Sequence, residues 1–194
     1  MTERALLLTG IGGQGIQLAA AVVARAAVLD GREVQLFGSY GGMMRGGATA
    51  ATLVVADQPI EAPPTVGRTW SAILMHHEHA DATLARLGPD SVVFCNTSVV
   101  PATALEHRGP VVAVAATDLA GAAGGTMAAS MVMVGAYAAA TGLVSLASLA
   151  TASRAALPPY RVQHADLNDR ALRVGFDAVA PRTVPAWPDG AKVA

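Results

Sequence analysis

The chain has 194 residues, of which 53 % are apolar, 14 % charged and 4 % aromatic, and its formal net charge is −1. This length suits one α/β domain, and the high apolar content with little charge excludes a disordered chain. Thirteen basic residues stand against fourteen acidic ones. The chain therefore has no excess of positive charge with which to bind nucleic acid.

The composition also bears on partners, redox chemistry and location. A protein that is this apolar and this poor in charge is expected to cover part of its surface with a partner. Its single cysteine, Cys95, can form no internal disulfide and cannot hold an iron–sulfur cluster, which takes about four ligands. The first residues do not follow the pattern of a signal peptide, so we expect a cytoplasmic protein.

Apolar runs of two kinds alternate along most of the chain. Short runs ended by glycine or polar residues predict strands, and longer Ala-rich or amphipathic runs predict helices. We expect strands over 5–9, 33–37, 49–55, 71–75, 91–95 and 111–115, and helices over 16–29, 80–87, 127–140, 143–156 and 166–176. This order predicts a three-layer, Rossmann-like α/β fold with a mostly parallel central sheet and helices on both faces. We expect one domain over residues 1–180 and a C-terminal tail over 181–194.

The segment 119–153 contains no charged residue and is long enough to cross a bilayer. However, Ala, Gly, Ser and Thr dominate the segment, which has few Leu and neither Ile nor Phe. Leu, Ile and Phe, which are scarce or absent here, are the residues that favour membrane insertion. With a break expected near Gly142, the segment predicts two buried helices and no membrane span.

The first glycine-rich motif, Gly10-Ile11-Gly12-Gly13-Gln14-Gly15, follows a predicted strand and opens a predicted helix. Glycines allow a tight turn there, and the helix N-terminus offers free N–H groups to an anion. A dinucleotide site would also need an acidic residue at the end of the second strand, and residues 36–40 contain none. Three interpretations stay open: a dinucleotide site, a site for another anionic ligand or a protein, and a turn with no ligand.

A second glycine-rich segment, 38–47, holds five glycines around Ser39, Tyr40 and Arg45 and is expected to be a loop. Loops at the carboxyl ends of neighbouring parallel strands face one crevice, so this loop is expected beside the first. Arg45 could present its guanidinium to a carboxylate, a phosphate or a thioester-linked group. Alternatively, Arg45 binds local carbonyl groups.

Other residues with reactive side chains carry weaker signals. His76-His77-Glu78-His79 has ligand types that suit zinc, but consecutive residues are expected to point in different directions, so we expect no metal site. The sequence offers no histidine and acid matched to Cys95 that would make it a nucleophile. Cys95 is therefore expected to be a small core residue. Asp118 and Asp166 are expected to cap helices. We expect no catalytic residue in this chain.

Taken together, the Gly10–Gly15 motif, the Ala-rich helix after it, Gly38-Ser39-Tyr40-Gly41 and Arg45-Gly46-Gly47 resemble one family. It is the gamma subunit of the 2-oxoacid:acceptor (ferredoxin) oxidoreductases, which act on pyruvate, 2-oxoglutarate and related acids. The resemblance covers residues 5–178. The chain departs from the family where Gly42-Met43 stands in place of Pro-Glu before the Met-Arg-Gly-Gly motif.

The resemblance implies one subunit of a hetero-oligomeric, thiamine-diphosphate-dependent enzyme that decarboxylates a 2-oxoacid oxidatively to an acyl-CoA. It implies that thiamine diphosphate and magnesium lie in alpha and beta subunits, and that iron–sulfur clusters lie in beta and a ferredoxin-like subunit. This chain would scaffold the complex and help to form the coenzyme A site. The residues implied for that cradle or subunit contact are Gly12, Gly13, Gln14, Gly15, Ser39, Tyr40, Arg45, Gly46 and Gly47. The alternatives are a stand-alone Rossmann-like nucleotide-binding protein and an assembly module without a ligand.

Overall fold

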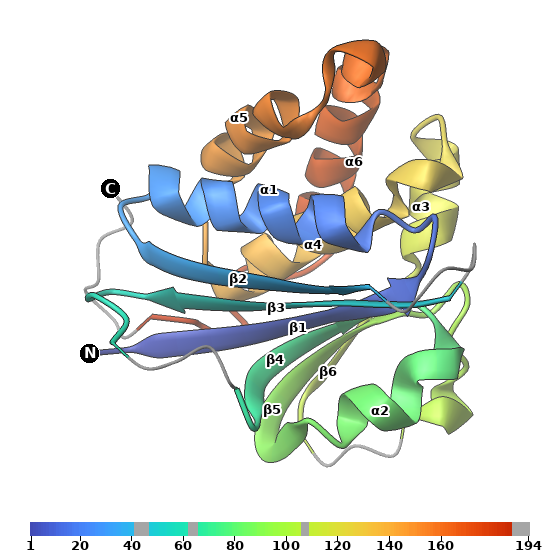
Figure 1. The fold of residues 1–194 in the computed structure, drawn as a ribbon. Coiled ribbons are helices and arrows are strands. Elements are labelled where there is room, and N and C mark those ends of the chain that lie inside the picture. The colour runs from blue at the N-terminus through green and yellow to red at the C-terminus, as the bar shows by residue number, and fades with distance from the viewer. Residues whose placement is uncertain (41–46, 62–65, 106–108, 188–194) are drawn as a thin grey trace.

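A six-stranded sheet forms the middle layer of the molecule (Figure 1). The computed structural model describes residues 1–40, 47–61, 66–105 and 109–187. In spatial order the strands are β2 (Glu33–Tyr40), β3 (Ala48–Ala56), β1 (Glu3–Ile11), β4 (Thr69–Leu74), β5 (Leu87–Asn96) and β6 (Val111–Val114). Strands β1, β4, β5 and β6 pair in parallel, whereas β3 runs antiparallel to both β1 and β2. The predicted, mostly parallel sheet is confirmed.

Helices cover both faces of the sheet, as predicted (Figure 1). The larger group packs on one face and consists of α1 (Ile16–Leu29), α3 (Ala116–Ala122), α4 (Ala129–Thr141), α5 (Leu146–Ala156) and α6 (Ala165–Asp177). The opposite face carries α2 (Ala80–Leu84), which packs on Leu7, Leu74 and Val93. Short 3₁₀ turns connect the elements: η1 (His77–His79), η2 (Ala102–Ala104), η3 (Thr126–Ala128) and η4 (Pro159–His164).

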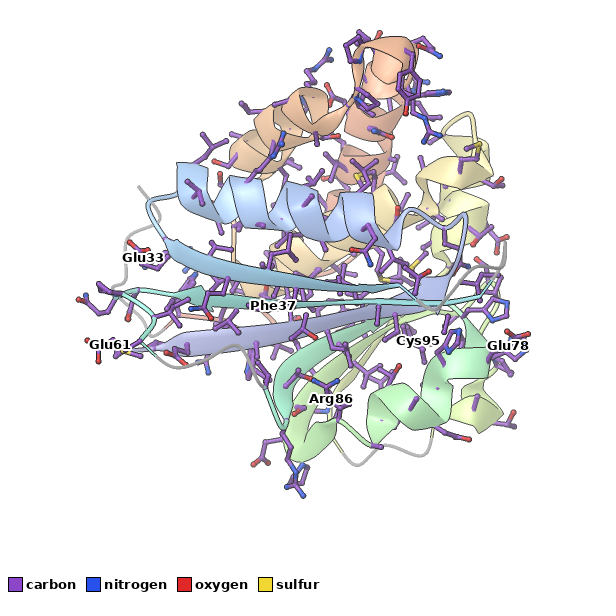
Figure 2. The ribbon with its side chains drawn as sticks, in the orientation of Figure 1. Glu33, Phe37, Glu61, Glu78, Arg86 and Cys95 are labelled. Atoms are coloured by element: carbon purple, nitrogen blue, oxygen red, sulfur yellow. The ribbon has the colours of Figure 1, made fainter. Side chains whose placement is uncertain are left out.

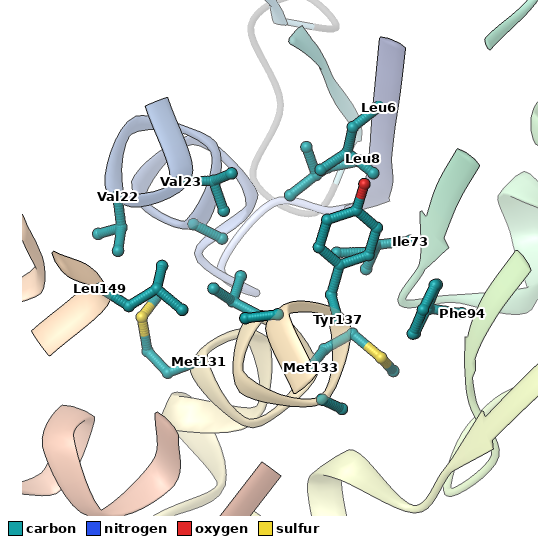
Figure 3. Close-up of a cluster of buried hydrophobic side chains, with 14 of the residues drawn as sticks. Leu6, Leu8, Val22, Val23, Ile73, Phe94, Met131, Met133, Tyr137 and Leu149 are labelled. Atoms are coloured by element: carbon teal, nitrogen blue, oxygen red, sulfur yellow. The ribbon is translucent and has the colours of Figure 1, made fainter. Parts of the chain in front are cut away.

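Helix α4 is the centre of the main core (Figure 3). Every one of its residues is buried. Tyr137 packs edge-to-face on Phe94 of the sheet, with ring centroids 4.9 Å apart, and its hydroxyl lies 2.9 Å from Ser71 Oγ. The uncharged segment thus forms α4 and α5, separated at Gly142 with φ 59°, as predicted. In the described ranges, no helix has the length and hydropathy to cross a membrane.

Helices α4 and α6 cross at two glycines, Gly135 and Gly175. A Cβ on Gly175 would collide with the carbonyl oxygen of Val132, and a Cβ on Gly135 would collide with that of Leu172. The two backbones therefore approach more closely than side chains would allow, so α6 packs directly on the backbone of α4.

Residues 182–187 pack against the C-terminal end of α4. The backbone N–H groups of Arg182, Val184 and Ala186 donate to the carbonyl oxygens of Ala139, Ala140 and Thr141, at 2.8, 3.0 and 2.7 Å. These bonds satisfy carbonyl groups that the end of a helix leaves free. The side chain of Arg4, at the start of β1, also donates to the Ala186 carbonyl oxygen at 2.5 Å. Part of the segment expected as a tail is thus a structural strap, and residues 188–194 lie outside the described residues.

Three local expectations are wrong. Gly38, Ser39 and Tyr40, expected in a loop, belong to β2, because β3 pairs with β2 as far as Tyr40. Asp118 and Asp166 do not cap their helices: each lies in the first turn, and the N-cap residues are Ala115 and His164. Helix α2 ends at Leu84, and Leu87 already belongs to β5.

A buried carboxylate joins α1 to α5. Asp30, 5 % exposed, accepts hydrogen bonds from Ser145 N (2.6 Å), Ser145 Oγ (3.0 Å) and Ser148 Oγ (2.5 Å) at the start of α5. Because Asp30→Ala leaves these donors without an acceptor, we expect it to lower the free energy of unfolding by about 2–4 kcal/mol, measured by urea denaturation. Asp30→Asn keeps one acceptor oxygen and should lose less. An equal loss in both variants would contradict this role.

Candidate functional site

The glycine loop, residues 10–15, closes on itself through the side chain of Gln14. The N–H of Ile11 donates to Gln14 Oε1 at 2.9 Å, and Gln14 N donates back to the Ile11 carbonyl oxygen at 3.2 Å. Gly13 and Gly15 adopt left-handed φ angles of 100° and 73°, which residues with a Cβ rarely adopt. Gly15 is the N-cap of α1, and no side chain of the described residues caps that helix. N–H groups in the first turn of a helix that no side chain caps can bind an anion.

The second predicted segment meets the glycine loop through Gly47. The N–H of Gly12 donates to the Gly47 carbonyl oxygen at 2.9 Å, just before β3 begins. Gly47, the last residue of that segment, is therefore a neighbour of the glycine loop, and β3 rather than β2 is the strand beside β1. Ser39 and Tyr40 form the end of β2 at the same edge of the sheet. Arg45 and Gly46 lie outside the described residues.

The histidine cluster lies beside the glycine loop, because Gln14 Nε2 donates to the carbonyl oxygen of Met75 at 3.2 Å. The donor atoms of His76, His77 and Glu78 lie within 4.8 Å of one another, so the expectation that these side chains diverge is wrong. The chain changes from extended backbone at His76 to the 3₁₀ turn η1, which brings the side chains together. Figure 2 shows Glu78 pointing outward at this end of the sheet.

These three side chains could hold a divalent metal with two imidazoles and one carboxylate. His77 Nδ1 lies 3.2 Å from the Val99 carbonyl oxygen, so its proton sits on Nδ1 and Nε2 is left for a ligand. His76 Nδ1 instead accepts the N–H of Glu78 at 3.4 Å, so binding a metal through Nδ1 would break this hydrogen bond, and binding through Nε2 would require a change of tautomer. His79 lies apart and lines a cavity of about 250 Å³ next to α2.

A cavity of about 200 Å³ borders Gly13 and Gly15, and the sequence does not predict it. Its other polar walls come from α4, η4 and α6 and are Ser130, Arg161, His164 and Asn168. These residues stand more than a hundred positions after the glycine loop and form no motif with it in the sequence. Only the three-dimensional packing of α1, α4 and α6 brings these residues together, so the sequence carries no signal of the cavity.

Cys95 is fully buried in β5, as expected for a core residue (Figure 2). Burial raises the pKa of its thiol to about 11. The unfolded thiol ionises near pH 8.5, so stability that is present at neutral pH should be lost as the pH rises from about 9 through 11. Burial raises the pKa of Tyr137 as well, so Cys95→Ala should reduce this loss without abolishing it. Urea denaturation at pH 7 to 11 measures this loss of stability. An identical pH dependence in the wild type and the Cys95→Ala variant would contradict the role of the thiol.

The family described as "Pyruvate ferredoxin/flavodoxin oxidoreductase" matches residues 5–178. The chain belongs to this family. Among curated relatives, the 2-oxoglutarate synthase subunit KorC of Methanothermobacter marburgensis is 32 % identical over 81 % of this chain and 88 % of its own length. The pyruvate synthase subunit PorC of the same organism is 30 % identical over 87 % of this chain and 93 % of its own.

Similar solved structures support the same family assignment. The gamma subunit of the keto/oxoacid ferredoxin oxidoreductase from Geobacter sulfurreducens superposes with a TM-score of 0.76 and 26 % identity, covering 91 % of this chain and 96 % of that one. This pyruvate ferredoxin/flavodoxin oxidoreductase family member is thus a gamma-type subunit of an oxidoreductase that acts on oxo groups with an iron–sulfur protein as acceptor. The 2-oxoglutarate:ferredoxin oxidoreductase from Magnetococcus marinus, solved with 2-oxoglutarate, coenzyme A and succinyl-CoA, shares the fold at 16 % identity and a TM-score of 0.80. The match covers 93 % of this chain and 32 % of that one.

Proposed function

We propose that this gamma subunit assembles with thiamine-diphosphate-binding alpha and beta subunits and, where present, a ferredoxin-like subunit. The complex oxidatively decarboxylates a 2-oxoacid to an acyl-CoA. Within it, this chain scaffolds the assembly, and its glycine loop contributes to the coenzyme A site. The relatives carry names for both 2-oxoglutarate and pyruvate enzymes, so the proposal stays at the class of 2-oxoacids.

One observation carries the ligand part of the proposal, namely the uncapped N-terminus of α1 behind Gly13 and Gly15. N–H groups at such a helix end bind anionic groups, and coenzyme A carries phosphates. The Gly12–Gly47 hydrogen bond holds Gly47, the last residue of the second glycine-rich segment, beside the glycine loop. A relative of the same fold has been solved with coenzyme A, which supports the choice of ligand.

The assembly part of the proposal rests on composition and surface. One cysteine cannot supply a cluster, so the electron-transfer centres belong to other chains. Large apolar side chains remain exposed at the free edge of the sheet and the nearby end of α1, where Val28, Leu29 and Phe37 are 60 %, 56 % and 39 % exposed. Burying such surface stabilises a permanent complex.

The test is to purify the complex through a tag on this chain and to weigh its partners by mass spectrometry. Equimolar thiamine- and cluster-binding proteins are expected, and a chain that elutes alone would refute the assembly.

The ligand part is tested with Gly13→Ala in that complex. Gly13 has φ 100° and open space around it, so the variant strains the loop without a collision. We expect the KM for coenzyme A to rise about tenfold, because the strained loop misplaces its N–H groups. Gly31 at the other end of α1 also has a left-handed φ, 72°, and open space, which makes Gly31→Ala the matched control. Equal effects of both variants would mean that the glycines serve chain geometry alone.

A further inference from the structure

Two imidazoles and one carboxylate gather in the turn that follows β4. Each of His76, His77 and Glu78 offers one ligand atom, and these atoms all lie within 4.8 Å of one another. The two imidazole rings stack, with centroids 4.4 Å apart and planes 27° from parallel. Ligand atoms that bind one zinc ion tetrahedrally at about 2.0–2.1 Å lie about 3.3 Å from one another. The side chains therefore have to close by about 1.5 Å at most, and His77 and Glu78 are exposed and can turn to do so.

The ring of His77 already has the orientation of a metal ligand. Its Nδ1 lies 3.2 Å from the carbonyl oxygen of Val99, which keeps the proton on Nδ1 and leaves the lone pair of Nε2 for a ligand. Histidines that bind metals almost always donate their other ring N–H to a carbonyl or a carboxylate. The acceptor is itself held in place, because Val99 N donates to the Asn96 carbonyl oxygen at 3.2 Å at the end of β5.

The other two side chains have little to give up when a metal binds. Glu78 points outward (Figure 2), and its carboxylate forms no ion pair with any other described residue. No lysine or arginine stands between Arg68 and Arg86, so the local sequence supplies no cation that would compete with a metal. His76 loses only the hydrogen bond from Glu78 N, which at 3.4 Å is long and therefore weak.

We propose that His76, His77 and Glu78 bind a divalent transition metal ion, with zinc as the best fit. Imidazole and carboxylate ligands suit zinc, and three protein ligands leave a fourth position of its tetrahedron to water. The bound ion would connect the turn after β4 to the segment after β5 through His77 and Val99, and so stabilise the folded chain. The site uses no residue of the glycine loop, so its test is independent of the proposed function.

The experiment titrates the full-length chain with zinc, after removal of any polyhistidine tag, because such a tag would itself bind the ion. Isothermal calorimetry measures the affinity and the stoichiometry, and circular dichroism follows thermal unfolding. We expect one zinc ion per chain and a rise in Tm of about 5–10 °C at a hundredfold excess over the Kd. Magnesium should produce neither effect, since it prefers sites made of oxygen ligands.

Three variants remove the ligands one at a time: His76→Gln, His77→Gln and Glu78→Gln. Each should weaken zinc binding at least about tenfold, because the loss of an outer-shell partner alone costs about 10–100-fold in metal affinity. Each should also remove most of the rise in Tm that zinc produces. Without zinc, the far-UV spectra of the variants should match that of the wild type.

His79 provides the matched control, because it belongs to the same turn but lies apart from the other three. Its Nε2 is buried, and the residue lines the cavity next to α2. His79→Gln should bind zinc like the wild type, and so should Glu33→Gln at the opposite end of the sheet (Figure 2).

Three results would overturn the site. The first is a wild-type chain that does not bind zinc. The second is an affinity that none of the three ligand variants lowers, which would place the ion elsewhere. The third is a loss in His79→Gln as large as that in His77→Gln.

Discussion

Gly175→Ala is expected to leave little folded protein. The new methyl group would collide with the carbonyl oxygen of Val132, and that oxygen belongs to the backbone of a helix buried on all sides. A flexible side chain could move aside, but here α6 must shift as a whole and open the core over α4. We expect a loss of about 3 kcal/mol or more in the free energy of unfolding, measured by urea denaturation followed by far-UV circular dichroism.

The control is another helical glycine, Gly121 of α3. A Cβ there would lie 3.5 Å from a methyl group of Thr126, which is ordinary contact. Gly121→Ala should therefore be neutral or should stabilise the protein by about 0.5–1 kcal/mol, because alanine favours helix. If Gly175→Ala behaved like Gly121→Ala, the close approach of α4 and α6 would be wrong.

Trp187→Ala is expected to have the second largest effect. The indole is 7 % exposed, its Nε1 donates to the Leu143 carbonyl oxygen at 3.2 Å, and the guanidinium of Arg32 lies 4.2 Å from its ring centroid. Removing a buried aromatic ring costs about 3–5 kcal/mol. The same urea titration, followed by far-UV circular dichroism, measures the loss.

Trp187→Phe separates packing from hydrogen bonding. Phenylalanine keeps most of the buried surface but cannot donate to Leu143, so the expected loss is about 1 kcal/mol. If the alanine and phenylalanine variants were equally stable, residues 182–187 would not belong to the core.

The fold class followed from the sequence because buried strands and Ala-rich helices have different periods and lengths. The position of β3 did not follow. The run over 49–55 looks like any other buried strand, and its antiparallel insertion between β1 and β2 depends on pairing across the sheet. That pairing also explains why Gly38 and its neighbours form a strand, since hydrogen bonds to β3 outweigh the local preference of glycine.

In the candidate site, too, some features could be predicted from the sequence and others could not. The glycine motif was readable because its residues are consecutive and their backbone requirements are local. The positions of Ser130 and Asn168 depend on how α4 and α6 reach the loop, and a single sequence contains no trace of that contact. The gathering of His76, His77 and Glu78 was missed for another reason. A single change from extended to 3₁₀ backbone redirects neighbouring side chains, and sequence periodicity does not detect it.

The strap at residues 182–187 sets the order in which the protein can be completed during synthesis. Its N–H groups close the end of the central helix, and its Ala186 carbonyl receives the side chain of Arg4 from the first strand. While the ribosome still covers this strap, the C-terminal end of α4 is uncovered, even though every glycine-rich motif has already emerged. Docking with partner subunits is therefore expected to follow emergence of the strap from the ribosome. Chains truncated after residue 180 should carry the family's motifs yet be degraded by cellular proteases.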